Sequence, residues 1–319
     1  REIRVQLEAG KNFTALLQKA CDGARPGDRI IIPVTRQTIE ATITVPAGVM
    51  VLSEGLATLE AGKNVDSMFR IAGKGNSIVR NLVFFGGKQA VEVAVSGARH
   101  VFKTCQFFNQ SNTAVLAMEK PEAVQIIDTL YYSDGGIETN AAHSEVLRNW
   151  ACNTPNMNER GFFINHGGDM LSEYNLFVPI LPRMDLENGK GIPGYENLNC
   201  GNNLRWYDCD NGRTSVLGNR FGGEFLGMTP AYTFGSNASF LMRGGFAWFG
   251  NIYIRRTAVY CHDAPKRILF QGVVLGPEGR FKGSANLPYD VTLRNPKDGS
   301  DMIGTVLPQI KASALTMHR

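Results

Sequence analysis

One short pattern of alternating apolar and polar residues recurs along the first half of the sequence. Four segments carry it, and they begin at Asn81, Thr104, Asp128 and Asn149. A nearly fixed period of roughly 21 to 24 residues indicates a solenoid, in which each repeat is one coil that buries its apolar face against its neighbours. No other feature of the sequence restricts the fold so strongly.

Each repeat contains strands. The apolar runs 68–71, 90–95, 113–118 and 136–140 each precede a corner that contains Gly or Ser, and the repeated segment follows. The period is too short for a pair of helices and lacks the leucine spacing of a leucine-rich repeat, whereas two or three strands of about five residues fill it. We therefore predict an all-β fold, a parallel β-helix. Equivalent residues should stack in columns inside it, Leu82 over Cys105 and Phe84 over Phe107 over Tyr131.

Composition agrees with a single β-helix domain. The chain has 319 residues, of which 43% are hydrophobic and 19% charged, and no stretch approaches the roughly 18 apolar residues that cross a membrane. The formal charge is +4, without a run of Lys and Arg, so nucleic acid is not expected as a partner and an anionic polymer is compatible. The sequence does not reveal an oligomeric state.

Export is expected, although the sequence shows no signal peptide, because a mature form without its leader has the same appearance. The location would then be secreted, periplasmic or at the cell surface. Six cysteines form no C-x-x-C pair, which argues against a zinc ribbon or a thioredoxin-type site. Cys105 and Cys152 fall at inward positions and are interpreted as core residues. Cys200 and Cys209 would suit a disulfide in an exported protein.

The sequence also predicts how the domain is divided. Asn12 is a candidate N-cap, and an apolar stripe at helical spacing follows it, so a helix over about 12–24 should cap the solenoid. Coils extend to about residue 282. A segment rich in Pro, Gly, Asn and charged residues, about 179–201, separates the coil that begins at Gly161 from the one that begins at Arg205, and we interpret it as an inserted functional loop. Residues 283–319 are predicted to be a C-terminal cap or tail.

A resemblance to a known family appears directly after the capping helix. The stretch Pro26-Gly27-Asp28-Arg29-Ile30 begins the first strand, and rungs with the pattern N-x-x-F follow. A capping helix, then P-G-D-x-I-x-x-P, then such rungs resembles the pectate-lyase-like superfamily of right-handed parallel β-helix proteins, over roughly residues 10–265. The resemblance implies the right-handed fold, and it implies no particular chemistry.

Polar residues that suit chemistry gather in the middle of the chain, on successive coils. Neighbouring rungs lie about 4.8 Å apart, so outward side chains at equivalent positions form a column. The alignment places Ile164 level with Asp208 and His166 level with Asp210. The candidate catalytic residues are His166, Tyr207, Asp208, Asp210 and Glu224. The candidate substrate-binding residues are Glu138, Asn140, Asn165, Arg205, Trp206, Arg213 and Trp248.

Two mechanisms suit this set. In β-elimination on a uronate polymer, Arg205 or Arg213 would neutralise the substrate carboxylate while His166 and Tyr207 move protons. In a glycoside hydrolase, two carboxylates flank the scissile bond, and Asp208, Asp210 and Glu224 supply candidates. The mild positive charge and the Arg, His and Tyr residues favour the lyase. The N-T-D, G-H-G and R-I-K motifs of polygalacturonases are missing, as are the W-I-D-H and R-x-P-x-x-R motifs of pectate lyases.

The same residues can also be interpreted as parts of turns without a catalytic role. Asp208, Asp210 and the following Asn-Gly are typical of a turn, and His166 before two glycines lies at a corner. No cofactor or metal is expected, although a calcium site at Asp208 and Asp210 is an alternative. A noncatalytic, tailspike-like carbohydrate-binding module is a further alternative, in which exposed aromatic residues such as Trp206 and Trp248 would stack on sugars.

Overall fold

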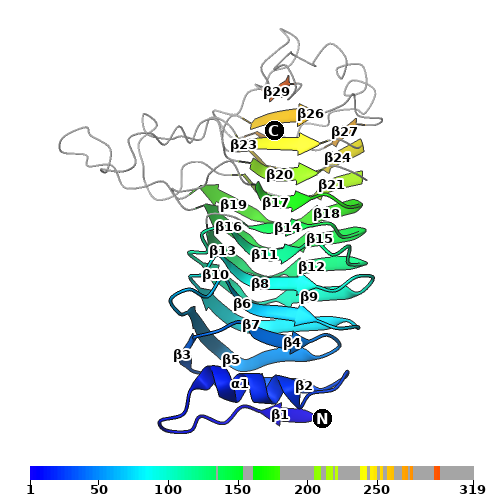
Figure 1. The fold of residues 1–319 in the computed structure, drawn as a ribbon. Coiled ribbons are helices and arrows are strands. Elements are labelled where there is room, and N and C mark those ends of the chain that lie inside the picture. Colours follow the sequence, from blue (N-terminus) through cyan, green and yellow to red (C-terminus); the bar gives the residue numbers. More distant parts are fainter. Residues whose placement is uncertain are drawn as a thin grey trace, which may run out of the picture. The chain divides into compact units, whose positions relative to one another are not determined.

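The chain folds as a parallel β-helix. The computed structural model describes residues 1–133, 136–153 and 161–179, and beyond them the strands between Arg205 and Arg294. It comprises two units, an N-terminal unit of residues 1–149 and a C-terminal unit of residues 150–319. Each coil contributes one strand to each of three parallel ladders, which we number I, II and III in the order in which the chain passes through them (Figure 1). The predicted β-helix with a capping helix is confirmed.

In the N-terminal unit the three ladders are built as follows. Ladder I contains β4 (Ile43–Pro46), β6 (Ser67–Ala72), β8 (Gln89–Ala94), β11 (Thr113–Ala117) and β14 (Ile137–Thr139). Ladder II contains β1 (Glu2–Arg4), β2 (Arg29–Ile32), the first parts of β5 (Met50–Ala61) and β7 (Ser77–Phe85), and β9 (Arg99–Lys103), β12 (Ala123–Ile127) and β15 (His143–Leu147). Ladder III contains β3 (Arg36–Ile39), the second parts of β5 and β7, β10 (Gln106–Phe108) and β13 (Leu130–Ser133).

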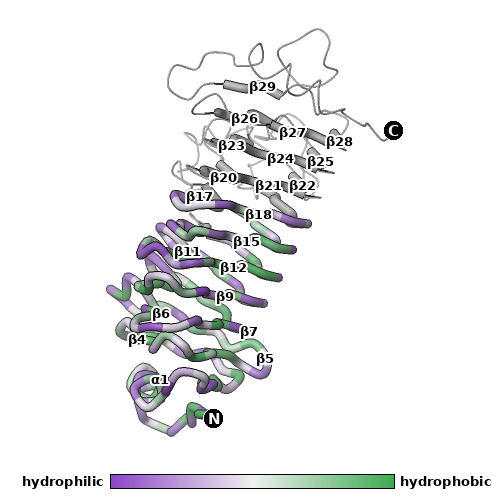
Figure 2. The backbone as a smooth tube through the Cα atoms, turned by 90° about the vertical axis from the view of Figure 1, so that its right-hand side faces the viewer, coloured by the Kyte–Doolittle hydropathy of each residue, from purple (hydrophilic) through white to green (hydrophobic). Residues whose placement is uncertain are grey.

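Inward side chains stack in columns, as predicted. The rings of Phe84 and Phe107 are stacked with centroids 5.5 Å apart, and those of Phe107 and Tyr131 with centroids 4.7 Å apart. Leu82 and Cys105 are both fully buried, and burial raises the pKa of the Cys105 thiol to about 12. Cys105 is therefore the inert core residue that the sequence indicates. Along β9, β12 and β15 buried and more exposed positions alternate, since successive strand positions face the core and the solvent in turn. Figure 2 shows that both hydrophobic and hydrophilic residues occur along these strands.

The corner between ladders II and III has left-handed backbone at one residue in each of four successive coils of the N-terminal unit. These residues are Asn81, Thr104, Asp128 and Arg148, with φ between 51° and 56°. The strand registers confirm the predicted alignment of the first three. The fourth alignment was wrong by a single position, because Arg148 rather than Asn149 occupies the left-handed position, directly after the pair in which Ile127 lies opposite Leu147. An arginine at this position makes the repeat difficult to recognise in the sequence, because Asn and Asp are the usual non-glycine residues with left-handed backbone.

A single helix in the described part of the chain, α1 (Phe13–Asp22), caps the N-terminal unit. The side chain of Asn12 accepts a hydrogen bond from the backbone N–H of Ala15 at 3.2 Å, which confirms it as the N-cap. Leu17 and Cys21 are buried beneath the helix. Figure 1 shows α1 lying across the end of the stack, where it contacts β3 and β4. No helix among the described residues is long and apolar enough to cross a membrane.

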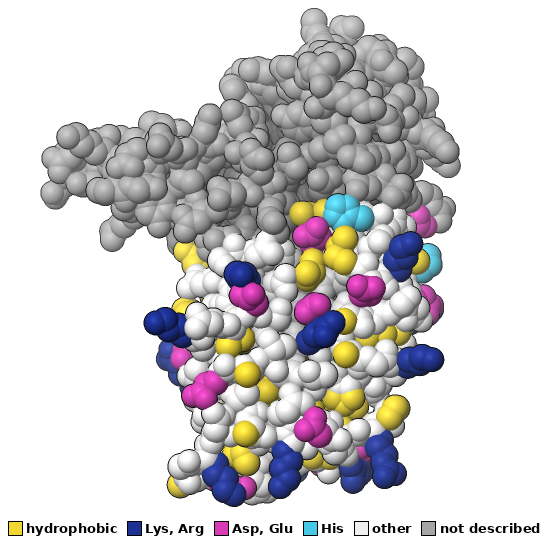
Figure 3. Space-filling model, viewed as in Figure 1, with side chains coloured by type: hydrophobic (Ala, Val, Ile, Leu, Met, Phe, Trp, Pro, Cys, Tyr) yellow, Lys and Arg dark blue, Asp and Glu magenta, His cyan; other side chains and the backbone are white. Residues whose placement is uncertain are grey.

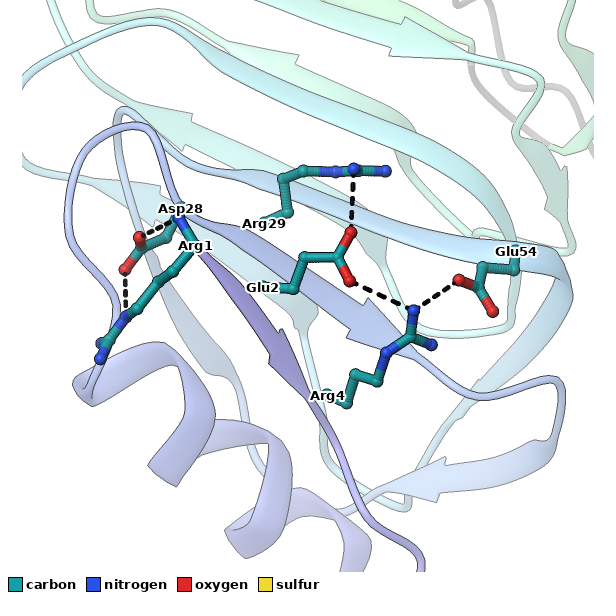
Figure 4. A network of polar contacts seen from close by, with 6 residues as sticks. All are labelled: Arg1, Glu2, Arg4, Asp28, Arg29 and Glu54. Carbon is teal, nitrogen blue, oxygen red and sulfur yellow. Dashed lines mark hydrogen bonds and ion pairs between the residues drawn. The ribbon is translucent and has the colours of Figure 1, made fainter.

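Strand β1, which the sequence did not predict, precedes this helix and carries a charge network (Figure 4). Arg29 donates to Glu2 at 3.0 Å, and Arg4 donates to Glu2 at 3.2 Å and to Glu54 at 2.8 Å. In the adjoining turn the backbone N–H of Arg25 donates to the Asp28 carboxylate and lowers its pKa to about 2. Exposed ion pairs contribute little stability, but charges along an outer strand oppose pairing with another chain.

The C-terminal unit repeats the three-ladder order. Ladder I contains β17 (Gly161–Asn165), β20 (Arg205–Cys209), β23 (Ala238–Met242), β26 (Thr257–Cys261) and β29 (Val291–Arg294). Ladder II contains β18 (Asp169–Glu173), β21 (Arg213–Leu217), β24 (Gly245–Phe249) and β27 (Ile268–Gln271). Ladder III contains β16 (Trp150–Asn153), β19 (Leu176–Pro179), β22 (Arg220–Phe221), β25 (Ile252–Tyr253) and β28 (Val274–Leu275).

Two boundary predictions bear on this unit. β29 lies within the predicted C-terminal cap and pairs with β26, so ladder I extends to Arg294. The division of the chain at residue 282 stays a prediction. The predicted core position of Cys152 and the predicted disulfide of Cys200 with Cys209 concern side chains outside the described residues.

Candidate functional site

The outer face of ladder I carries some of the predicted polar residues. In the N-terminal unit the registers align Thr44, Arg70, Glu92, Leu116 and Glu138 in one column. Arg70 and Glu92 form an ion pair at 3.4 Å. Glu138 is half-buried at an outer position of β14, and Asn140, also half-buried, directly follows the end of that strand. Figure 3 shows acidic, basic and hydrophobic side chains interspersed over the face in view, without a large patch of one kind among the coloured residues.

In the C-terminal unit the register confirms the predicted alignment of β17 with β20. Ile164 is level with Asp208, as predicted, and Phe163 is level with Tyr207. The Phe163 ring is fully buried, so position 163 belongs to the inner face. Position 207 is thus level with an inner position and position 208 with the next one, which alternation assigns to the outer face. The register of β20 with β23 shifts between Arg205 and Tyr207, so it does not assign position 206 to a face.

Asn165 has a different function from the predicted one. Its side chain is fully buried, accepts a hydrogen bond from the backbone N–H of Gly167 at 3.0 Å and donates to the carbonyl of Gly168 at 2.9 Å. These bonds shape the corner between β17 and β18, so Asn165 builds the turn and does not face a substrate. His166 is half-buried at the same corner, and Asp169 is the first residue of β18.

The remaining candidates are spread over two ladders and both edges of ladder I. Arg205 is the first residue of β20, at the edge opposite to the His166 corner. Arg213 begins β21 and Trp248 lies in β24, so both belong to ladder II. A five-residue strand spans about 13 Å, which separates Arg205 from the corner where β20 leads to β21. Asp210 and Glu224, and the predicted inserted loop, lie outside the described residues.

Sequence reasoning missed a regularity in the lengths of the connections between strands. In the N-terminal unit the connections that lead into β6, β8, β11 and β14 are short, and they span 62–66, 86–88, 109–112 and 134–136. In the C-terminal unit the connections that lead into β17, β20, β23 and β29 are longer, and they span 154–160, 180–204, 222–237 and 276–290.

The remaining connections of the C-terminal unit are short. The connection into β26 spans only 254–256, and among those that lead into ladders II and III the longest is 262–267. Counted between the described strands of this unit, the four longest stretches of sequence therefore each precede a strand of ladder I. The regularity appears once the strand bounds are known, and no single segment of the sequence reveals it.

Metal ligands do not gather in the described part of the chain, where no three His, Cys, Asp or Glu side chains form a group. The predicted calcium alternative concerns Asp208 and Asp210, whose side chains are outside that part. The half-buried carboxylates on ladder I of the N-terminal unit are separated by Leu116 in their column. This face therefore offers polar contacts rather than a chelating site.

Comparison with known proteins supports the fold. No family model matches the chain, and no curated protein matches it in sequence. Among solved structures, the crystal structure of alginate lyase from Paenibacillus sp. str. FPU-7 is similar with a TM-score of 0.56 and 14% identity, over 83% of this chain and 94% of that one. DFA-IIIase from Arthrobacter chlorophenolicus A6, crystallised without its lid, has a TM-score of 0.34 and 12% identity, over 92% of this chain and 98% of that one. The first likeness shows that the fold of this chain also occurs in a solved protein.

Proposed function

We propose that this protein is a carbohydrate-active enzyme that cleaves an acidic polysaccharide by β-elimination. The observation that supports the proposal is that, between the described strands of the C-terminal unit, the four longest stretches of sequence each precede a strand of ladder I. Insertions in a solenoid tend to gather beside its binding face. The outer face of ladder I, with Asp208, would then hold the polymer. The likeness to an alginate lyase, a protein named for a reaction of this class, supports the choice of substrate.

The register of β18 with β21 supports one assignment of the candidate roles over the others. His166 and Arg213 belong to adjacent coils, at the corner between ladders I and II. Met170 and Thr214 pair with each other, and each is the second residue of the strand that follows this corner. We assign Arg213, rather than Arg205, to neutralise the uronate carboxylate, which stabilises the carbanion formed when His166 removes the neighbouring proton. The bond to the leaving glycosidic oxygen then breaks as the carbon–carbon double bond of the unsaturated uronate forms, and water protonates the leaving oxygen. Trp206 would stack on a sugar ring. Tyr207 loses its proposed role as proton donor, because its position belongs to the inner face of β20.

A first experiment separates elimination from hydrolysis. The protein would be incubated with a panel of acidic and neutral polysaccharides while near-ultraviolet absorbance of an unsaturated uronate and release of reducing ends are followed together. Elimination raises both signals, and hydrolysis raises reducing ends alone. Binding without either signal would contradict enzymatic function and favour the noncatalytic module.

Substitutions then test the site. We expect His166→Ala to lower kcat at least 100-fold, the usual range for loss of a general base, without a change in the circular dichroism spectrum. Trp206→Ala should raise KM more than it lowers kcat. Glu92→Gln on ladder I of the N-terminal unit and Trp150→Ala, which removes an exposed tryptophan of ladder III, are the matched controls. Equal activity of the His166 variant and the controls would refute the assignment.

One observation favours glycoside hydrolysis as the second candidate. Position 208 lies on the outer face, and Asp210 follows two residues later, so two carboxylates of one coil can flank a bond. In that case Asp208→Asn should abolish the release of reducing ends, and no uronate absorbance should appear with the wild-type enzyme.

A further inference from the structure

A histidine lies in the core of the N-terminal unit without a hydrogen-bond partner. His100, the second residue of β9, has an exposed fraction of 0%, and neither ring nitrogen has a partner among the described residues. Its neighbours in ladder II are Ser77 of β7 and Val124 of β12. The Ser77 hydroxyl oxygen accepts instead from the backbone N–H of Gly48 at 3.2 Å. A buried polar group without a partner costs free energy, and a buried charge without a partner costs more.

No charged side chain faces this imidazole from the described strands packed around it. On ladder II the inward positions beside and beyond it are occupied by Ser77, Val124 and Ser144. The titratable residues of those strands, at outer positions, are Arg80, Arg99, Lys103, His143 and Glu145. The buried positions of β8 and β11 in ladder I are apolar except for Thr113, and Cys105 and Tyr131 are the titratable core residues of ladder III and its corner. Nothing in this part of the core would compensate an imidazolium.

We propose that His100 makes the N-terminal unit sensitive to acid, because its protonation expels the ring from the core and separates β9 from β7 and β12. The inference rests on burial, on the unpaired nitrogens and on the register of three strands. It is independent of the proposed enzymatic function. In a solenoid, each coil is stabilised mainly by its two neighbours, so the loss of one coil in the middle divides the stack into two parts.

The direction of the pH effect follows from linkage. Burial lowers the pKa of His100 from 6.5 to about 4. Between these values the unfolded chain binds a proton that the folded unit does not, so stability is complete above about pH 6.5 and is lost as the pH falls toward 4. The equilibrium constant for unfolding should rise by up to tenfold per pH unit in this interval, on the order of 300-fold in all.

Denaturant unfolding of the wild type, His100→Gln and His100→Phe between pH 4 and 7.5 tests the proposal. Carboxylates contribute acid sensitivity to every variant, so the quantity compared is the difference in slope. We expect the His100 variants to lose the increase of the unfolding constant that the wild type shows between pH 6.5 and 4.5. His143→Gln is the matched control, since His143 begins β15 in the same ladder and is exposed. Its slope should equal that of the wild type.

A second measurement keeps the proposal testable should the His100 variants fail to fold. In the wild type labelled at histidine, nuclear magnetic resonance should show one of the five imidazoles remaining neutral down to about pH 4, until the unit unfolds. Titration of all five near pH 6.5 in the folded protein would overturn the proposal. So would identical pH slopes for the wild type and a folded His100 variant.

Discussion

The buried side-chain amide of Asn149 forms hydrogen bonds to two other residues at one corner. Its side-chain oxygen accepts hydrogen bonds from the backbone N–H of Thr129 at 2.9 Å and from the Thr129 hydroxyl at 2.7 Å. Its amide nitrogen donates to the carbonyl of Ile126 at 3.0 Å. The residue is only 2% exposed, so these groups have no access to bulk water. A single side chain thereby completes the backbone hydrogen bonding at the corner between β12 and β13.

Removal of this amide should be costly. Asn149→Ala leaves the N–H of Thr129 and the carbonyl of Ile126 buried without these bonds, so we expect the free energy of unfolding to fall by about 3 kcal/mol. Asn140→Ala, at a half-buried position of the same coil, should change it by less than about 0.5 kcal/mol. Urea denaturation followed by circular dichroism measures both. A similar, small effect of the two substitutions would contradict this account of the corner.

At the scale of one element, α1 blocks the end of ladder I. Gln18 accepts from the backbone N–H of Thr44 at 2.9 Å and donates to its carbonyl at 3.2 Å, so a side-chain amide takes the place of a neighbouring strand at the edge of β4. Thr14 adds a bond from the backbone N–H of Glu40 at 2.9 Å. An uncovered edge strand is a template for pairing with other chains, and this helix covers one.

Gln18→Ala should therefore affect association as well as stability. We expect a loss of about 1 kcal/mol in the free energy of unfolding and an increase in light scattering with protein concentration, because the two backbone groups of Thr44 become available. Lys19→Ala, at the adjacent exposed position of the helix, serves as the comparison. If both variants scatter light equally, the edge of β4 is protected by something other than Gln18.

The elements also show what the sequence could reveal. The coils, the stacked aromatic column and the N-cap were predictable, because face alternation and capping are local signals. Strand β1 was missed, since its charged residues carry no apolar alternation. The candidate site was harder to predict from the sequence. Asn165 has a residue type suited to substrate binding, yet its hydrogen bonds commit it to a turn, and Tyr207 was grouped with Asp208 although adjacent strand residues occupy opposite faces.

At the scale of the whole molecule, the long connections offer a test of where function is located. Residues 180–204, which join β19 to β20, can be replaced by a short connection like 109–112, which joins β10 to β11. Closing a shorter loop costs little entropy, so the β-sheet circular dichroism signal should persist. Cleavage of the polysaccharide should fall at least 100-fold. Retained cleavage with a normal KM would place the site away from this corner.

The left-handed corner has a consequence for how proteins of this kind are recognised. Asn, Thr, Asp and Arg all occupy it in the N-terminal unit, and Tyr174 occupies it in the C-terminal unit with a φ of 52°. The path of the backbone therefore determines the left-handed conformation at this corner, and five residue types occur there. Chains with this fold can therefore exchange the residue at this corner while the coil persists. A search for one residue type at this position would miss such coils, whereas a search for the backbone path would find them.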